Sequence, residues 1–176
     1  MRKTDIKHSI ILKNDGMRNL SLSKILLDKK TVILGIGNPL RGDDGFGSIL
    51  AKRLRGKIKA EVLDGGSCPE NFLGKILEKK PKMILILDCA DFGGEPGQIK
   101  LFNHSEFKDL KFYSTHNISL NHLIDFLLRE KIKNIMVLVV QPKEIKFKEG
   151  LSKRVSLALK NIEKELLNTR AVGEFL

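Results

Sequence analysis

The clearest structural pattern in the chain is the stretch Thr31-Val-Ile-Leu-Gly-Ile-Gly-Asn-Pro-Leu-Arg-Gly-Asp-Asp-Gly-Phe-Gly47. Its first six residues form a continuous apolar run rich in β-branched side chains, which is typical of a strand covered on both faces. A glycine-rich turn follows, and we expect a helix to begin at about Gly45 and to end at about Leu54. A buried strand, a tight turn and a helix in this order indicate the opening unit of an α/β fold.

The same alternation continues through the rest of the chain. Further apolar runs predict strands near Ala60–Leu63, Lys82–Leu87, Gln98–Phe102 and Asn134–Val140. Pro69 stands where it can open a helix that reaches about Lys79. Helical spacing of apolar residues predicts helices over 119–130 and Leu151–Leu167. Because strands and helices alternate, we expect an α/β fold with one three-layer domain, in which a twisted, mainly parallel β-sheet is flanked by helices on both faces.

The two ends of the chain look unlike this central part. Residues 1–30 hold eight Lys and Arg side chains against three Asp, a net charge of +5, and they precede the first convincing strand. We therefore divide the chain into an N-terminal extension (1–30), a peptidase domain (31–168) and a C-terminal tail (169–176). The extension is interpreted as a flexible tail, a docking arm, or the product of a start upstream of Met17.

Composition argues against a membrane or secreted protein. The 176 residues suit one domain, and 41% of them are hydrophobic. No apolar run reaches the ~18 residues of a membrane span, and the charged N-terminus lacks the apolar core of a secretory signal. Two cysteines, Cys68 and Cys89, are too few for a disulfide framework and fit a reducing compartment. We therefore expect a cytoplasmic protein with no membrane partner.

The net charge of +11 is spread along the chain. Its densest cluster, Lys52-Arg-Leu-Arg-Gly-Lys-Ile-Lys59, reads as the end of a helix, where cations are favoured by the helix dipole. The chain has one Tyr, no Trp and no basic run interleaved with aromatic residues. We therefore expect no nucleic-acid partner, although a basic protein invites that interpretation.

Ligands of parallel α/β sheets bind beyond the carboxyl ends of the strands, so we searched those segments first. Gly35 and Gly37 look like part of a dinucleotide-binding loop, but Leu40 stands where its third glycine belongs and Pro39 lacks an amide donor. What this loop does supply is the pair Asp43-Asp44 at the start of a helix. Helix capping accounts for one Asp of the pair.

Two further candidates follow other predicted elements. Asp88 comes directly after the apolar run 82–87, and His116 lies in the loop before the helix 119–130. Two carboxylates and one imidazole suit a borderline divalent ion such as nickel or zinc, and they leave coordination positions open for a water or a substrate carbonyl. Other residues near this edge remain alternatives, namely Asp43, Asp64, Asp91, His122, Cys68 and Cys89.

These residues fall within a series of short motifs: Gly35-Ile-Gly-Asn-Pro-Leu-Arg-Gly-Asp-Asp-Gly-Phe-Gly47, Asp64-Gly-Gly-Ser-Cys-Pro-Glu-Asn71, Leu87-Asp-Cys-Ala-Asp-Phe-Gly93, Pro96-Gly97, Ser114-Thr-His-Asn117 and Gln141-Pro142. With these motifs in this order over about residues 31–168, the chain resembles the hydrogenase maturation endopeptidases. The resemblance implies a twisted sheet flanked by helices. It also implies removal of a short C-terminal peptide from the large subunit of a nickel–iron hydrogenase once nickel has been inserted.

The resemblance places the family's site residues on Asp44, Asp88 and His116. Other members have Glu at the first of these positions, so Asp44 resembles the branch that serves hydrogenase 3, or an archaeal hydrogenase of related kind. One feature departs from the family pattern, and another argues against the two cysteines as metal ligands. The basic N-terminal extension is not part of that pattern, and Cys68 and Cys89 stand where small residues also occur.

The resemblance leads to a hypothesis in which nickel, the only cofactor we expect, is supplied by the precursor. Asp44, Asp88 and His116 would contact that nickel, and one of the two catalytic residues Asp44 and Asp88 would act as general base. Gly65 and Gly66 would let the substrate backbone approach closely. We expect a monomer whose partner is the large-subunit precursor. The alternatives are a metal-dependent hydrolase of another substrate and a nickel-sensing docking module that does not cut.

Overall fold

The computed structural model describes Leu22 and residues 30–109 and 117–168. Most of the N-terminal extension, the C-terminal tail and residues 110–116, which include the candidate His116, lie outside the described residues. Among the residues that are described, no helix has the length and apolar character needed to cross a membrane. The division of the chain into extension, domain and tail stays a prediction.

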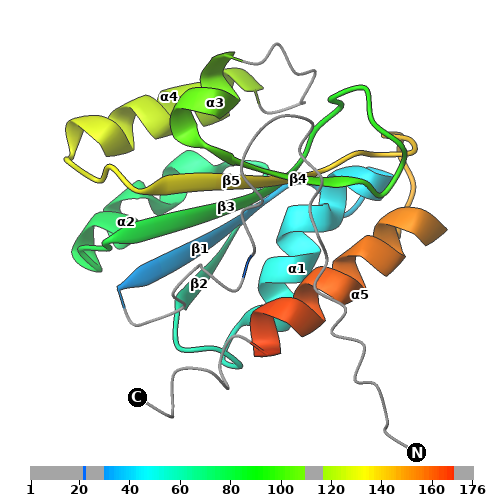
Figure 1. The fold of residues 1–176 in the computed structure, drawn as a ribbon, viewed down its shortest axis with the longest axis horizontal. Helices are drawn as coiled ribbons and strands as arrows, with labels where there is room; N and C mark the ends of the chain where they lie inside the picture. The colour runs from blue at the N-terminus through cyan, green and yellow to red at the C-terminus, as the bar shows by residue number, and fades with distance from the viewer. Residues whose placement is uncertain (1–21, 23–29, 110–116, 169–176) are drawn as a thin grey trace, which may run out of the picture.

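The described strands form one sheet in the order β2-β1-β3-β5-β4 (Figure 1). They are β1 (Thr31–Ile36), β2 (Glu61–Gly66), β3 (Met83–Cys89), β4 (Ile99–Asn103) and β5 (Ile135–Val140). Strand β1 pairs in parallel with β2 and β3, β3 pairs in parallel with β5, and β4 runs antiparallel to β5. From β1 the chain passes to β2 on one side of it and then to β3 on its other side. The direction in which strands are added therefore reverses between β1 and β3.

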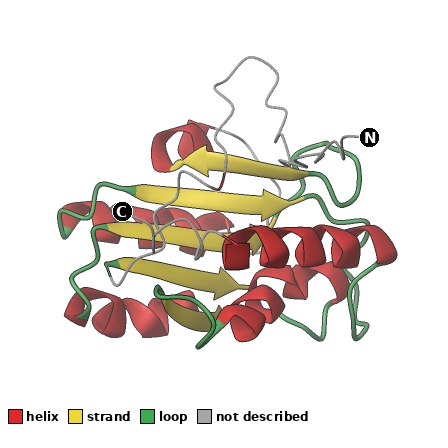
Figure 2. Ribbon diagram, turned by 60° about the horizontal axis from the view of Figure 1, so that its bottom comes forward, coloured by secondary structure: helices red, strands yellow, loops and turns green. Residues whose placement is uncertain are grey.

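Two packed cores cover the two faces of this sheet. Side chains alternate between them along each central strand, as the period of two requires: Ile33 and Leu85 face one core, while Leu34 and Ile86 face the other. The first core packs against α1 (Phe46–Leu54) and α5 (Lys153–Asn168), and the second against α2 (Leu73–Glu78), α3 (His104–Asp109) and α4 (Asn117–Arg129). Figure 2 shows the resulting three layers. The predicted α/β fold is confirmed.

The differences from the predicted elements lie at their ends. A 3-10 turn, η2 (Gly42–Gly45), precedes α1, and a second one, η3 (Pro69–Phe72), precedes α2. Strand β3 continues to Cys89, so Asp88 lies inside the strand and not after it. The short helix α3 was not predicted, because six residues give too little periodicity to recognise.

Candidate functional site

Most of the buried polar side chains of the described residues gather at the carboxyl edge of the sheet. Asp43, Asp44 and Asp88 are each fully buried, and Gln141 is nearly so. They lie just after β1, at the end of β3 and just after β5. Strand order reverses between β1 and β3. Ligands of open α/β sheets bind beyond the carboxyl ends of the strands at such a reversal point.

Close packing of glycines brings Asp44 to this edge. A Cβ atom on Gly47 would lie 2.1 Å from the carbonyl oxygen of Leu87 and 2.4 Å from that of Ile36, so the start of α1 lies directly on the ends of β3 and β1. Gly37 has a φ of 129°, and a Cβ there would lie 1.8 Å from the carbonyl oxygen of Asp44. Only glycine permits both approaches. The glycines of this loop therefore serve packing, and through it they set Asp44 beside the end of β3.

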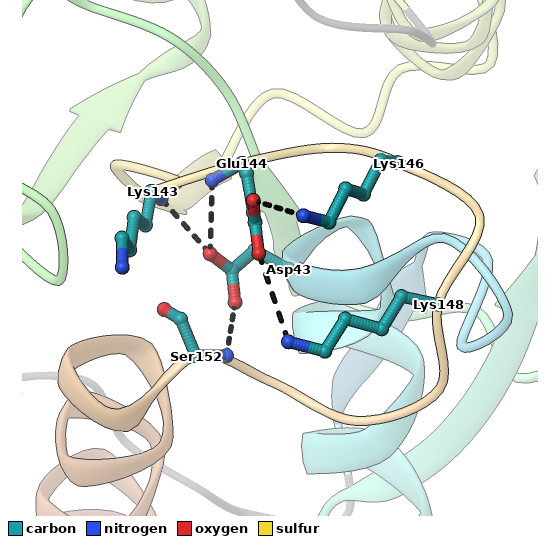
Figure 3. A network of polar contacts seen from close by, with 6 residues as sticks. All are labelled: Asp43, Lys143, Glu144, Lys146, Lys148 and Ser152. Atoms are coloured by element: carbon teal, nitrogen blue, oxygen red, sulfur yellow. Dashed lines mark hydrogen bonds and ion pairs between the residues drawn. The ribbon is translucent and has the colours of Figure 1, made fainter.

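Asp43 has a structural role. Its carboxylate accepts hydrogen bonds from the backbone amides of Lys143 (2.9 Å), Glu144 (3.3 Å) and Ser152 (2.6 Å). Figure 3 shows the carboxylate enclosed by this segment. The sequence predicted a structural role, as a helix cap, for one Asp of the pair. Asp43 has a structural role, but its carboxylate binds backbone amides that lie 100 or more residues away in the chain and not those of the helix it precedes.

Asp44 and Asp88 are held differently. Oδ2 of Asp44 accepts a hydrogen bond from the amide of Asn38 (2.9 Å), and Oδ1 of Asp88 accepts one from the amide of Cys89 (2.8 Å). Each of these bonds fixes the direction of a buried carboxylate. Both carboxylates are therefore held in place at the carboxyl edge of the sheet, and their catalytic role stays a prediction.

The pKa of the Cys89 thiol shows that several carboxylates lie close to it. Burial raises its pKa most, and the negative charges of Asp88, Asp44, Asp43 and Asp91 raise the pKa further, in that order. Four carboxylates thus act on one buried sulfur atom. Cys89 is fully buried in the first of the two cores, as a small apolar residue is. Cys68 is exposed.

Gln141 was quoted among the motifs without a role, and the structure provides one. Its Oε1 accepts hydrogen bonds from the amides of Phe92 (2.9 Å) and Gly94 (3.1 Å), and its Nε2 donates to Oδ1 of Asp91 (2.9 Å). The amide of Gly93 and the side chain of Gln141 together lower the pKa of Asp91. Gln141 therefore fixes the loop that follows β3. A polar residue directly after an apolar strand was the signal that could have found it, as it found Asp88.

The remaining candidates are placed as follows. Asp64 accepts a hydrogen bond from the amide of Gly66 (3.1 Å) and pairs with Lys52 (3.2 Å), so it shapes the end of β2. His122 is exposed on α4. Gly66 has open space where a Cβ would stand, whereas Gly65 packs against β1 and Pro69. Substrate contact at Gly65 and Gly66 stays a prediction.

Metal coordination also stays a prediction. Within residues 30–109 and 117–168, no group of three or more His, Cys, Asp and Glu side chains is arranged to hold an ion. The predicted set of Asp44, Asp88 and His116 needs a third member that lies outside the described residues. The described part of the site is therefore a pair of buried, oriented carboxylates.

Fold and site together define a class: an α/β protein with an acidic site at the carboxyl edge of a doubly covered, mainly parallel sheet. A family model described as hydrogenase maturation protease matches residues 47–169. The hydrogenase 3 maturation protease of Escherichia coli is 34% identical over 146 residues, which cover 82% of this chain and 93% of that protein. The chain belongs to the hydrogenase maturation protease family.

Solved structures agree with this assignment. The crystal structure of the nickel–iron hydrogenase maturation protease HycI from Thermococcus kodakarensis matches with a TM-score of 0.71 and 28% identity, covering 80% of this chain and 92% of that one. The solution structure of the endopeptidase HycI from Escherichia coli matches with a TM-score of 0.68 and 31% identity, over 78% and 89% of the two chains. Both the predicted family and the predicted fold are confirmed.

Proposed function

We propose that this chain is an endopeptidase that removes the C-terminal peptide of the nickel-loaded large-subunit precursor of a nickel–iron hydrogenase. Asp44 and Asp88 are its catalytic residues, and they share contact with the precursor's nickel with His116. The observation that carries the proposal is the burial of these two oriented carboxylates at the reversal point of the sheet, in a chain of the maturation protease family.

The chemistry needs a base and a means of polarising the scissile bond. One of the two carboxylates takes a proton from a water molecule, the oxygen of that water attacks the peptide carbonyl, and the proton passes to the departing amine as the C–N bond breaks. The other carboxylate holds the substrate through its nickel. Because both side chains are buried, electrostatic interactions at this site are stronger than they are in water.

Nickel is part of the substrate in this proposal. Two carboxylates and one imidazole form a sparse ligand set for a borderline divalent ion, so most of the coordination must come from the precursor itself. Loaded precursor is thereby distinguished from empty precursor, because only the loaded form offers an ion for Asp44, Asp88 and His116 to contact. We further infer that the chain acts in the cytoplasm as a monomer, since its partner is itself a larger folded protein.

The test is incubation of the purified chain with nickel-loaded and with nickel-free precursor, followed by the intact mass of the precursor. We expect loss of one C-terminal peptide from the loaded form only. Equal cleavage of both forms would contradict a role for nickel. Binding of the loaded form without any cleavage would show a docking module, and cleavage of unrelated peptides instead of either precursor would show a hydrolase of another substrate.

A further inference from the structure

An exposed apolar pair lies beside the proposed site. Among the described residues, Leu40 (48% exposed), Phe147 (88%) and Leu157 (60%) are the large hydrophobic side chains left in water. The first two stand on segments that pair. Arg41 and Lys148 form a parallel β-bridge, in which the amide of Lys148 donates to the carbonyl of Leu40 (3.0 Å) and the amide of Gly42 donates to that of Lys148 (2.7 Å). Leu40 and Phe147 each directly precede a residue of this bridge, so the two exposed side chains stand on neighbouring segments.

Phe147 is exposed although the backbone on both sides of it is fixed. On one side the carboxylate of Asp43 binds the amides of Lys143 and Glu144, and on the other it binds the amide of Ser152. The β-bridge at Lys148 adds a further attachment. Figure 3 shows this segment wrapped around Asp43. An aromatic side chain on a fixed support loses little freedom on binding, which is the property of an interface anchor.

Cations stand on both sides of Phe147 in the sequence and across the β-bridge, with Glu149 also exposed among them. Arg41, Lys143, Lys146 and Lys148 are all exposed. Lys146 and Lys148 both lie near the single carboxylate of Glu144, at 2.7 Å and 3.7 Å. Exposed ion pairs of this kind contribute little to stability. The lysines can therefore exchange Glu144 for the carboxylates of a partner at little cost.

We propose that the Phe147 face, formed by Leu40, Arg41, Lys143, Lys146, Phe147 and Lys148, docks a surface segment of the large-subunit precursor that presents an apolar side chain flanked by carboxylates. The proposal rests on the proposed function and adds the place where the substrate is held. The exposed cations of this face favour a partner segment that carries negative charge. Leu40 and Arg41 precede Asp44 by four and three residues, so a segment docked here lies next to the catalytic edge.

The test compares Phe147→Ser with Leu157→Ser, which removes another exposed apolar side chain, from α5. Steady-state cleavage of nickel-loaded precursor is measured for both variants and for the wild type. We expect Phe147→Ser to raise KM about 10- to 50-fold, the loss typical of an interface anchor, with kcat changed less than twofold. Leu157→Ser stays within twofold of the wild type in both constants.

A charge variant gives an independent reading. The double substitution Lys146→Glu and Lys148→Glu is expected to raise KM about 10-fold or more at low salt, with the difference shrinking as salt rises. If the wild type cleaves the precursor but Phe147→Ser and the charge variant both keep its KM, the docking proposal is overturned and the proposed function stands. If the wild type neither binds nor cleaves the precursor, both proposals fall.

Discussion

The two edges of the sheet differ in what they bury. At the amino edge, the turns that lead into β2, β3 and β5 carry exposed lysines, among them Lys59, Lys82 and Lys133. At the carboxyl edge stand Asp43, Asp44 and Asp88, which are all the buried acidic side chains of the described residues. Burying a carboxylate costs several kcal/mol before its partners compensate. The amino edge therefore has the composition that stability alone favours. The carboxyl edge carries buried charges that the stability of the fold alone does not require.

The carboxyl edge is itself divided. Asp43 uses its carboxylate to hold three amides of a distant segment, so it serves structure. The carboxylate of Asp44, the next residue, accepts a hydrogen bond from Asn38 instead, and together with that of Asp88 it raises the pKa of the Cys89 thiol in β3. Substitutions at these neighbouring positions should therefore separate loss of activity from loss of stability.

The largest effect is expected from Asp44→Asn and Asp88→Asn, made separately. In the proposed mechanism each substitution removes a charge that serves proton transfer or contact with nickel, so each should lower kcat by about 10²- to 10⁴-fold. An Asn side chain keeps one acceptor for the amide of Asn38 or Cys89, so the melting temperature should change by only a few degrees. The measurement is cleavage of loaded precursor beside a thermal melt. Cleavage within twofold of the wild type would remove that residue from the site.

The next effect tests how closely α1 approaches the sheet. Gly47→Ala places a Cβ 2.1 Å from the carbonyl oxygen of Leu87, and backbone has to move to relieve that contact. We expect a loss of about 3 kcal/mol or more in the free energy of unfolding, in the range of severe steric changes. The control is Gly74→Ala in α2, where nothing lies within 4 Å; it should stabilise by up to about 1 kcal/mol. If both variants unfolded at the same urea concentration, the packing argument would be refuted.

Asp43→Asn should lower the free energy of unfolding by about 2–3 kcal/mol. Whichever way its amide turns, an NH2 group faces at least one backbone amide that now lacks an acceptor. Amide hydrogen exchange at Lys143, Glu144 and Ser152 should accelerate. At a temperature where the variant is folded, it should still cleave far faster than Asp44→Asn. A variant as inactive as Asp44→Asn but fully stable would place Asp43 in the catalytic machinery instead.

The smallest effect belongs to the amino edge. Lys131 lies two residues after the end of α4 and has a φ of 65°; its amide donates to the carbonyl of Leu128, and the amide of Ile132 donates to that of Leu127. This arrangement favours glycine, because a side chain is strained there. Lys131→Gly should therefore stabilise the protein by about 0.5–1 kcal/mol without changing activity. Lys133→Gly, two residues on, should bring no such gain, and a gain of equal size there would point to charge and not to backbone strain.

The sequence predicted what local patterns encode. Apolar runs gave β1, β3 and β5, and the segments after the first two runs drew attention to the pair Asp43-Asp44 and to Asp88. The resemblance then selected Asp44 and Asp88 as site residues, and their catalytic role stays a prediction. What it could not predict depends on pairing between distant segments. The attachment of Asp43 to amides about 100 residues away, and the pairing of Leu40 with the Phe147 segment, leave no local periodicity to recognise. The end of β3 was missed by two residues, because a buried aspartate reads as the end of a strand.

The central claim is that Asp44, Asp88 and His116 act as one unit on a nickel-bearing peptide. The most direct measurement is the cleavage rate of loaded precursor by Asp44→Asn, Asp88→Asn and His116→Ala, singly and all together. Residues that act as a unit lose most of their effect with the first substitution. The account predicts that the triple variant is slowed about as much as the slowest single variant. Losses that multiply across the three positions would contradict it.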